Sequence, residues 1–183
     1  MTIMKWLLEL LDPVQLIGYA GMLCAVLSYQ CKKNQTYFFF QILCSTFFMV
    51  QFILLGSWAG MIMNVFGIYR GVILYMGKKC EKMGFLISIQ VCFVISAVVS
   101  VVVFNEMIWI AVLLFLAQAG GTLAMWSRDG RIIRGVQVFV ASPAWIINNI
   151  CYFSMGGILC EVFNIVSVLV SVLRFRKTGF DKA

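Results

Sequence analysis

Seven long apolar runs, separated by short polar breaks, occupy almost the whole chain. The runs are 14–31, 35–55, 57–76, 84–104, 107–126, 131–153 and 156–174. A helix of about 20 apolar residues crosses a hydrocarbon core of roughly 30 Å, so each run is long enough to span a membrane. In lipid every backbone polar group must be satisfied within the protein, and a helix achieves this within one segment. The pattern therefore predicts an all-α membrane protein with seven transmembrane helices, in which consecutive helices are antiparallel neighbours.

The composition leaves little material for a water-exposed surface. Of 183 residues, 63% are apolar and 11% are charged, and the mean hydropathy is +1.00, whereas soluble proteins carry about 25% charged residues. We therefore expect a single membrane domain, 1–183. The chain has no histidine, which excludes histidine-based metal sites and Ser-His or Cys-His catalysis. Its seven cysteines form no C-x-x-C pair and mostly lie in apolar runs, where cysteine acts as a small hydrophobic residue. We expect no metal, no cofactor and no enzymatic activity.

The basic residues are concentrated in every second break between the apolar runs. Thirteen of the fourteen lysines and arginines lie in or beside the breaks after the first, third and fifth runs, or at the C-terminal end. By the positive-inside rule, this pattern places the N-terminus outside and the C-terminus in the cytoplasm. Such clustering makes the net charge of +7 a topology signal rather than a sign of nucleic-acid binding. Residues 1–13 are predicted to lie along the membrane interface, with Trp6 at the headgroups, and 175–183 to form a cytoplasmic tail.

The chain matches itself at a shift of 97 residues. The matched pairs include Ser57 with Ser154, Gly60 with Gly157, Val65 with Val162 and Phe66 with Phe163. The shift defines a first triple-helix unit, 14–76, a linker helix, 84–104, and a second triple-helix unit, 107–174. Because three spans reverse the direction of the chain and the linker reverses it again, the two units point the same way. Parallel repeats of this kind place a substrate site near the midplane, where the halves meet.

Three stretches resemble a known family. They read F-I-L-L-G-S-W-A-G-M-I-M-N-V-F-G-I-Y-R-G at 52–71, A-W-I-I-N-N at 144–149 and S-M-G-G-I-L-C-E-V-F at 154–163. They resemble the YgjV family of bacterial inner-membrane proteins, and the 3-1-3 layout resembles the SWEET, PQ-loop and PnuC transporters. The resemblance implies a parallel bundle with opposed polar residues on the third and seventh helices, but it implies no substrate. The Pro-Gln pair of many PQ-loop and SWEET repeats is absent, and Pro143 is the one proline placed to act as a hinge within the membrane.

Glu161 is the residue least suited to its apolar run. An ionised carboxylate at the bilayer centre costs about 2.5–3.5 kcal/mol on insertion scales, so Glu161 must pair with a cation, be protonated or face a wet cavity. Its equivalent in the first unit is Asn64, and Arg70, almost two turns from Asn64, is not expected to be a fixed partner of Glu161. We predict a substrate-binding set consisting of Asn64, Glu161, Asn164, Asn148, Asn149, Gln51, Trp145 and Tyr152. Three other glutamines are predicted to form hydrogen bonds between helices: Gln41, Gln90 and Gln137.

These features favour a transporter or facilitator of a small polar solute, working by alternating access between the two triple-helix units in the bacterial inner membrane. A second hypothesis stays open: a non-transporting receptor, sensor or assembly subunit, because one fold hosts unrelated functions. The expected partners are the lipid bilayer and the solute. The residues do not decide between a monomer and a homo-oligomer, and they do not identify the solute or any coupling ion.

Overall fold

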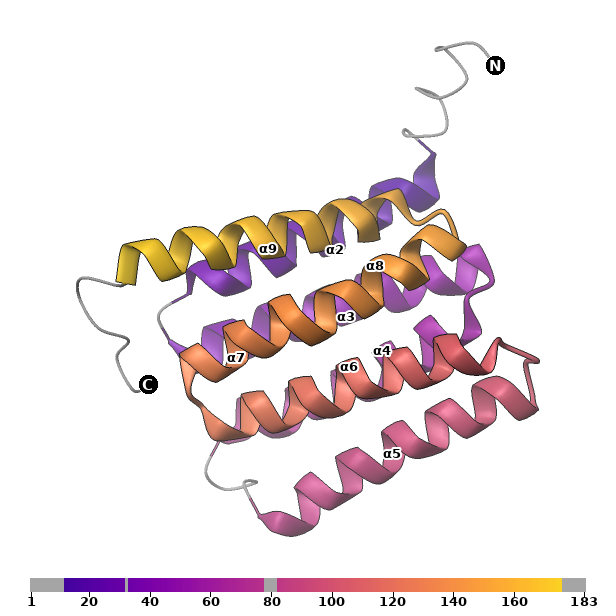
Figure 1. Cartoon of the computed structure of the whole chain (residues 1–183), viewed down its shortest axis with the longest axis horizontal. Coiled ribbons are helices and arrows are strands. Elements are labelled where there is room, and N and C mark those ends of the chain that lie inside the picture. Colours follow the sequence, from indigo (N-terminus) through magenta and orange to yellow (C-terminus); the bar gives the residue numbers. More distant parts are fainter. Residues whose placement is uncertain (1–11, 32, 78–81, 176–183) are drawn as a thin grey trace.

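The computed structural model describes residues 12–31, 33–77 and 82–175, and nearly all of them are helical (Figure 1). The helices are α2 (Pro13–Gln30), α3 (Asn34–Leu55), α4 (Trp58–Met76), α5 (Met83–Val102), α6 (Ile108–Ser127), α7 (Gly130–Val136), the π-helix η2 (Gln137–Ala141), α8 (Ser142–Cys151) and α9 (Met155–Phe175). Because α7, η2 and α8 follow one another without a break, they form one rod. The described ranges contain no strand, which confirms the all-α prediction, and their seven rods match the seven predicted runs. The predicted interfacial segment and tail lie almost entirely outside these ranges.

Local sequence explains where the rods begin and end. Asp12 precedes α2, and its Oδ1 accepts a backbone N–H two residues later at 2.9 Å, while Pro13 occupies the first turn, where no N–H is needed. Gly56 ends α3 with a φ of 73°, a left-handed conformation that glycine adopts without a Cβ clash. Asp129 caps α7 in the same way as Asp12, accepting a backbone N–H at 2.8 Å. The short polar breaks of the sequence therefore contain the residues that stop and restart the helices.

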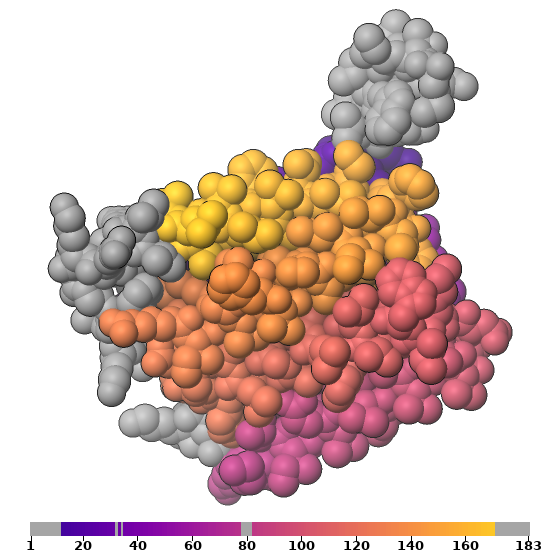
Figure 2. All heavy atoms as spheres, in the orientation of Figure 1, coloured from indigo at the N-terminus to yellow at the C-terminus, as the bar shows by residue number. Residues whose placement is uncertain are grey.

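The rods form two layers. Helices α2, α3 and α4 pack in sequence as one layer, the first unit, and α6, α7–η2–α8 and α9 pack in sequence as the other, the second unit. Figure 1 shows α9 in front of α2 and α6 in front of α4, and these two pairs are in contact. Helix α5 lies along the edge, against α4 and α6. In Figure 2 the second unit covers one face of the molecule, with α5 beyond α6.

The two units run in the same direction. In Figure 1, α2 and α6 run the same way, as do α3 and α7–η2–α8, and α4 and α9. The helix boundaries follow the 97-residue shift closely: Gln30, the last residue of α2, falls on Ser127, the last of α6, and Trp58, the first of α4, falls on Met155, the first of α9. The contacts between units are equivalent too, because the shift relates α2 to α6 and α4 to α9, and α2 touches α9 as α6 touches α4.

The exterior suits lipid. Helices α3, α4, α5 and α6 are each long and apolar enough to cross a membrane, and Met155–Val170 of α9 is a shorter apolar helix. The sixth predicted run is divided into α7, η2 and α8, of seven, five and ten residues, and none of these is long enough by itself. Large apolar side chains point outward, and Leu23 on α2, Val98 on α5 and Leu123 on α6 are each more than half exposed. Such a surface is unfavourable in water and favourable in a bilayer.

Candidate functional site

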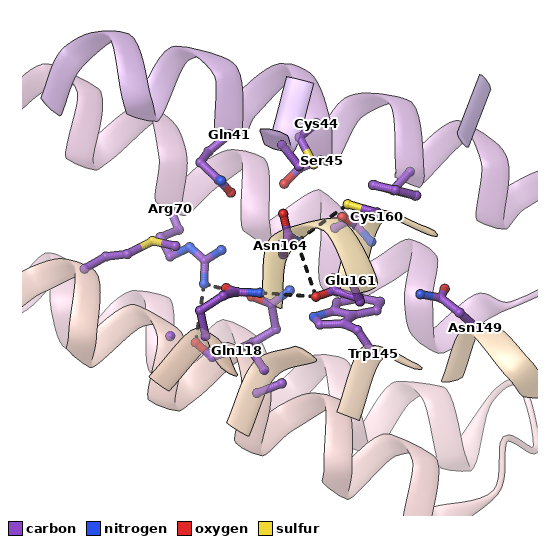
Figure 3. A pocket seen from close by; sticks show the side chains of 18 of the residues that line it. Gln41, Cys44, Ser45, Arg70, Gln118, Trp145, Asn149, Cys160, Glu161 and Asn164 are labelled. Carbon is purple, nitrogen blue, oxygen red and sulfur yellow. Dashed lines mark hydrogen bonds between the residues drawn. The ribbon is translucent and has the colours of Figure 1, made fainter. Parts of the chain in front are cut away.

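A cavity lies between the two units, with the middle rods α3 and α7–η2–α8 on opposite sides (Figure 3). The volume of the cavity is about 90 Å³, whereas one water needs about 10–15 Å³ by the same measure. Every rod except α5 contributes to the lining. The polar lining residues are Tyr29, Gln41, Ser45, Asn64, Arg70, Gln118, Gln137, Asn149, Glu161 and Asn164. A space of this size and polarity can hold several waters or a small polar solute.

Glu161, on α9, is buried at 8% exposure and lines this cavity. Three neutral donors hold its Oε2: the hydroxyl of Ser142 at 2.6 Å, the amide of Gln137 at 3.2 Å and the amide of Asn164 at 3.3 Å. Within the described ranges Oε1 accepts no hydrogen bond, and it is not among the fully buried polar atoms that lack a partner. Oε1 therefore keeps some accessible surface. One oxygen of the carboxylate is anchored, and the other is left for a molecule in the cavity.

The π turn brings two of these donors together. Gln137 and Ser142 are five residues apart, a spacing that an α-helix places on different faces and a π turn places on the same face. The backbone N–H of Ser142 donates to the carbonyl of Gln137, and the Gln137 amide donates to the Ser142 hydroxyl at 3.1 Å. Pro143, directly after the turn, has no N–H for the ordinary helical bond, which favours an interruption of the helix here. The irregular turn thus builds the binding place for the carboxylate.

Arg70, on α4, is the second buried charge of the cavity, at 7% exposure. Its Nη1 donates to three acceptors on α6: the Oε1 of Gln118 at 2.8 Å, the carbonyl of Gln118 at 3.4 Å and the hydroxyl of Thr122 at 3.2 Å. The guanidinium carbon lies 5.7 Å from the centre of the Phe93 ring. No Asp or Glu oxygen of the described residues lies within 4.0 Å of the guanidinium. Arg70 and Glu161 therefore line one cavity without forming an ion pair.

Equivalent positions of the two units line the cavity in pairs. The 97-residue shift relates Cys44 to Ala141, Phe48 to Trp145, Phe52 to Asn149 and Asn64 to Glu161, and all eight residues contribute to the lining. The rings of Phe52 and Trp145 stack across the two units, with centroids 5.8 Å apart. The shift therefore relates four pairs of lining positions in the two layers, and it places the carboxylate of Glu161 at the position equivalent to the amide of Asn64.

A family model described as Imp-YgjV, bacterial inner membrane protein, matches residues 13–179. The matched range includes every residue that lines the cavity. The chain belongs to the Imp-YgjV family. Comparison with curated proteins and with solved structures gave no match. The resemblance to the YgjV family is thereby confirmed, and the chain is a membrane protein of a bacterial inner-membrane family. The relation of Imp-YgjV to the SWEET, PQ-loop and PnuC transporters stays a prediction.

Five of the eight predicted binding residues of this Imp-YgjV protein line the cavity: Asn64, Trp145, Asn149, Glu161 and Asn164. The Asn64 amide donates to the carbonyl of Gly60 at 2.8 Å. Asn149 and Asn164 are almost fully buried, and the Oδ1 atom of each lacks a hydrogen-bond donor. These five are the candidates for contact with a solute.

The other three predicted residues lie outside the cavity lining. Gln51 is fully buried, donates to the Oε1 of Gln15 at 3.3 Å and accepts from the Ser154 hydroxyl at 3.1 Å. Asn148 is buried, and neither polar atom of its amide has a partner. The Tyr152 hydroxyl donates to Glu106. Gln51 and Tyr152 thus hold helix ends together. Helical periodicity alone does not separate such positions from those that face the cavity.

The residues of the site that were not predicted to bind solute include Arg70, Gln118, Gln137 and Ser142. Arg70 and Gln118 meet because α4 packs against α6, a sideways contact for which a single sequence carries no signal. Gln137 is predicted to form a hydrogen bond between helices, and it does so. Its acceptor is the carboxylate of Glu161, which makes Gln137 part of the site. Pro143, which follows Gln137 and Ser142, could have indicated that these two residues meet, because a proline inside a span indicates an irregular turn.

Proposed function

We propose that this protein is a transporter or facilitator of a small polar solute. One observation carries the proposal: the buried carboxylate of Glu161 keeps one oxygen free at a cavity between two parallel helical units. A carboxylate inside a membrane costs about 2.5–3.5 kcal/mol on insertion scales. Helix packing does not require that cost, since an amide of similar shape would accept the Ser142 hydroxyl. A residue that binds cargo does require it.

The proposed architecture is a parallel 3-1-3 repeat of seven spans, with the N-terminus outside and the C-terminus in the cytoplasm. Helix α5 is the linker whose reversal keeps the two units parallel. The agreement of helix boundaries at a shift of 97 residues supports the repeat, as do the equivalent contacts α2–α9 and α6–α4. The alternation of basic residues supports the topology. Sites at the junction of such repeats suit alternating access, because small rotations of one unit against the other expose the junction to either side.

The moving parts proposed are the two units themselves. The stacked rings of Phe52 and Trp145 connect α3 to α8 across the cavity, so opening would separate them. The π turn and Pro143 interrupt the middle rod of the second unit and provide a place where it can bend. No enzymatic role is proposed, because the groups that surround the Glu161 carboxylate oxygen are neutral amides and a hydroxyl.

The test is uptake by proteoliposomes. Vesicles containing the purified protein are incubated with pooled small polar solutes, and their contents are identified by mass spectrometry after washing. Wild type is expected to accumulate at least one solute above protein-free vesicles. Glu161→Gln removes the charge but retains the shape, and it is expected to reduce that uptake at least tenfold.

The matched control is Glu106→Gln. Glu106 is a half-buried acid that accepts hydrogen bonds from Tyr152 and from the backbone of Ala59, but it does not line the cavity. Its substitution is expected to leave uptake within about twofold of wild type. Equal uptake by wild type and Glu161→Gln, or no accumulation of any solute, contradicts the proposal.

A further inference from the structure

We propose that the solute is a small zwitterion, whose cationic group binds at Glu161 and whose anionic group binds at Arg70. The inference rests on the proposed function and specifies its cargo. Both side chains are buried, both line the cavity, and they form no ion pair with each other. Figure 3 shows the two side chains in the same hollow, with Gln118 beside Arg70 and Trp145 beside Glu161.

The end of the cavity at Glu161 offers a carboxylate with one open oxygen. The Oε1 of Glu161 takes no hydrogen bond from the described residues and keeps accessible surface, whereas the Oδ1 atoms of Asn164 and Asn149 lack donors but are sealed in the packing. Asn164 is bonded to Glu161 through its amide nitrogen, and Asn149 packs against Gly157, one helical turn before Glu161. An ammonium group has several N–H donors and no acceptor, so it matches a negatively charged group that keeps one oxygen open to the cavity. The ring of Trp145 adds an aromatic face of the kind that attracts cations.

The end at Arg70 is rich in unused donors. All hydrogen bonds that Arg70 makes within the described ranges use Nη1, which ties the side chain to α6. Its Nε and Nη2 atoms are not among the sealed polar atoms without a partner, so they keep accessible surface. These two nitrogens form one edge of the guanidinium, and that edge matches a carboxylate through two parallel hydrogen bonds. Arg70 is thus fixed by one nitrogen and open on the edge that binds anions.

Charge balance selects a zwitterion over singly charged solutes. In a medium of low dielectric constant, each buried charge without a partner is strongly unfavourable. A cation would offset Glu161 and leave Arg70 unmatched, and an anion would do the reverse. A neutral polyol would offset neither charge. A solute with both groups matches both residues, and the filled cavity has no net charge.

Binding is tested on the purified protein in lipid nanodiscs, by the shift of the thermal unfolding midpoint that tryptophan fluorescence reports. The probes are two matched sets: γ-aminobutyrate with butyrate and n-butylamine, and ε-aminocaproate with caproate and n-hexylamine. A ligand that binds only the folded state raises the midpoint, by an amount that grows with the logarithm of its concentration relative to its dissociation constant. At least one zwitterion is expected to bind at least tenfold more tightly than both of its singly charged analogues. If neither does, the proposal is overturned.

Charge-changing variants provide a second readout, which a loss of folding cannot imitate. Glu161→Gln is expected to reverse the preference, so that butyrate or caproate binds more tightly than the matching zwitterion. Arg70→Gln is expected to favour the amines, and Arg70→Lys, which retains the charge, is expected to retain zwitterion binding. Glu106→Gln, outside the cavity, is expected to leave all affinities unchanged. Retained zwitterion preference in both neutral variants overturns the assignment of the two ends.

The two proposals fail in different ways. Glu161-dependent uptake of a polyol or a singly charged solute, without zwitterion binding, keeps the transport proposal and overturns the zwitterion. Zwitterion binding without uptake in proteoliposomes keeps the ligand and overturns transport.

Discussion

The two triple-helix units have the same order and direction of helices, yet their middle rods differ. In the first unit α3 is an unbroken helix in close contact with glycines of its neighbours: a Cβ added to Gly18 would lie 2.4 Å from Gln51, and one added to Gly71 would lie 2.6 Å from Ile42. In the second unit the equivalent rod is interrupted by the π turn, and a Cβ added to Gly120 would have 3.6 Å to its nearest neighbour.

The difference indicates that the two units have different roles. Both units contain close glycine contacts, since a Cβ added to Gly157 would lie 2.4 Å from Asn149, but in the first unit such contacts lie on both sides of an unbroken middle rod. The second unit has the irregular turn, the carboxylate and all three hydrogen-bond donors to that carboxylate. We infer that the second unit supplies the carboxylate with its donors, whereas the first unit supplies close packing and Arg70, and each of the following predictions tests that contrast.

The largest effect is expected where α4 packs closely against α3. Gly71→Ala forces its new Cβ into Ile42 and is expected to lower the free energy of unfolding by about 1–3 kcal/mol, the usual range for overpacking. Gly120→Ala, in the second unit, meets only ordinary contacts and is expected to be neutral or stabilising by up to about 1 kcal/mol, from helix propensity. Thermal unfolding of both variants in one detergent measures the difference. Equal destabilisation of the two would remove the contrast in packing.

A smaller effect is expected at a pair of equivalent amides. Gln51→Leu leaves the Ser154 hydroxyl without its acceptor and is expected to cost about 1–2 kcal/mol of stability. The equivalent residue, Asn148, is buried without any partner, so Asn148→Leu is expected to be neutral or stabilising. The unfolding midpoints of the two variants test this. If Asn148→Leu were destabilised and Gln51→Leu were neutral, the role of Gln51 in packing would be contradicted.

An effect on uptake rather than on stability is expected at two equivalent serines. Ser142→Ala removes the 2.6 Å hydrogen bond to the Glu161 carboxylate and is expected to reduce uptake about tenfold, since a hydrogen bond to a charged group contributes about 1.5–3 kcal/mol. Ser45, its equivalent, lines the cavity but does not contact the carboxylate, and Ser45→Ala is expected to keep uptake within about twofold. Initial uptake rates of the solute found in the screen measure both. Similar losses in the two variants would show that the second unit has no special role.

The helices, their boundaries and the pairing of Glu161 with Asn64 follow from the sequence, because span length, capping residues and a 97-residue shift are local or linear properties. The sequence also predicts that Arg70 is not a fixed partner of Glu161, and in the structure the two residues form no ion pair. Its place in the same cavity depends on which helices pack side by side, a property that apolar faces specify poorly.

Gln137 and Ser142 are not predicted as partners of Glu161, because the sequence interpretation assumes α-helical spacing where the chain makes a π turn. Tyr152 is in the predicted binding set, but it lies at the end of α8 and bonds to Glu106 instead of lining the cavity.

The central claim is that water reaches the cavity at Glu161, and Cys44 allows a direct measurement because it lines the same cavity. Two variants are compared in nanodiscs, one retaining only Cys44 and the other only Cys92, which is partly exposed on α5 and does not line the cavity. The account predicts that a trimethylammonium-bearing methanethiosulfonate reagent, which does not enter lipid, modifies Cys44 at least tenfold faster than Cys92. It also predicts that Glu161→Gln slows the Cys44 reaction, because the carboxylate attracts the cationic reagent. Equal and slow modification of the two cysteines, unaffected by Glu161→Gln, would contradict the claim.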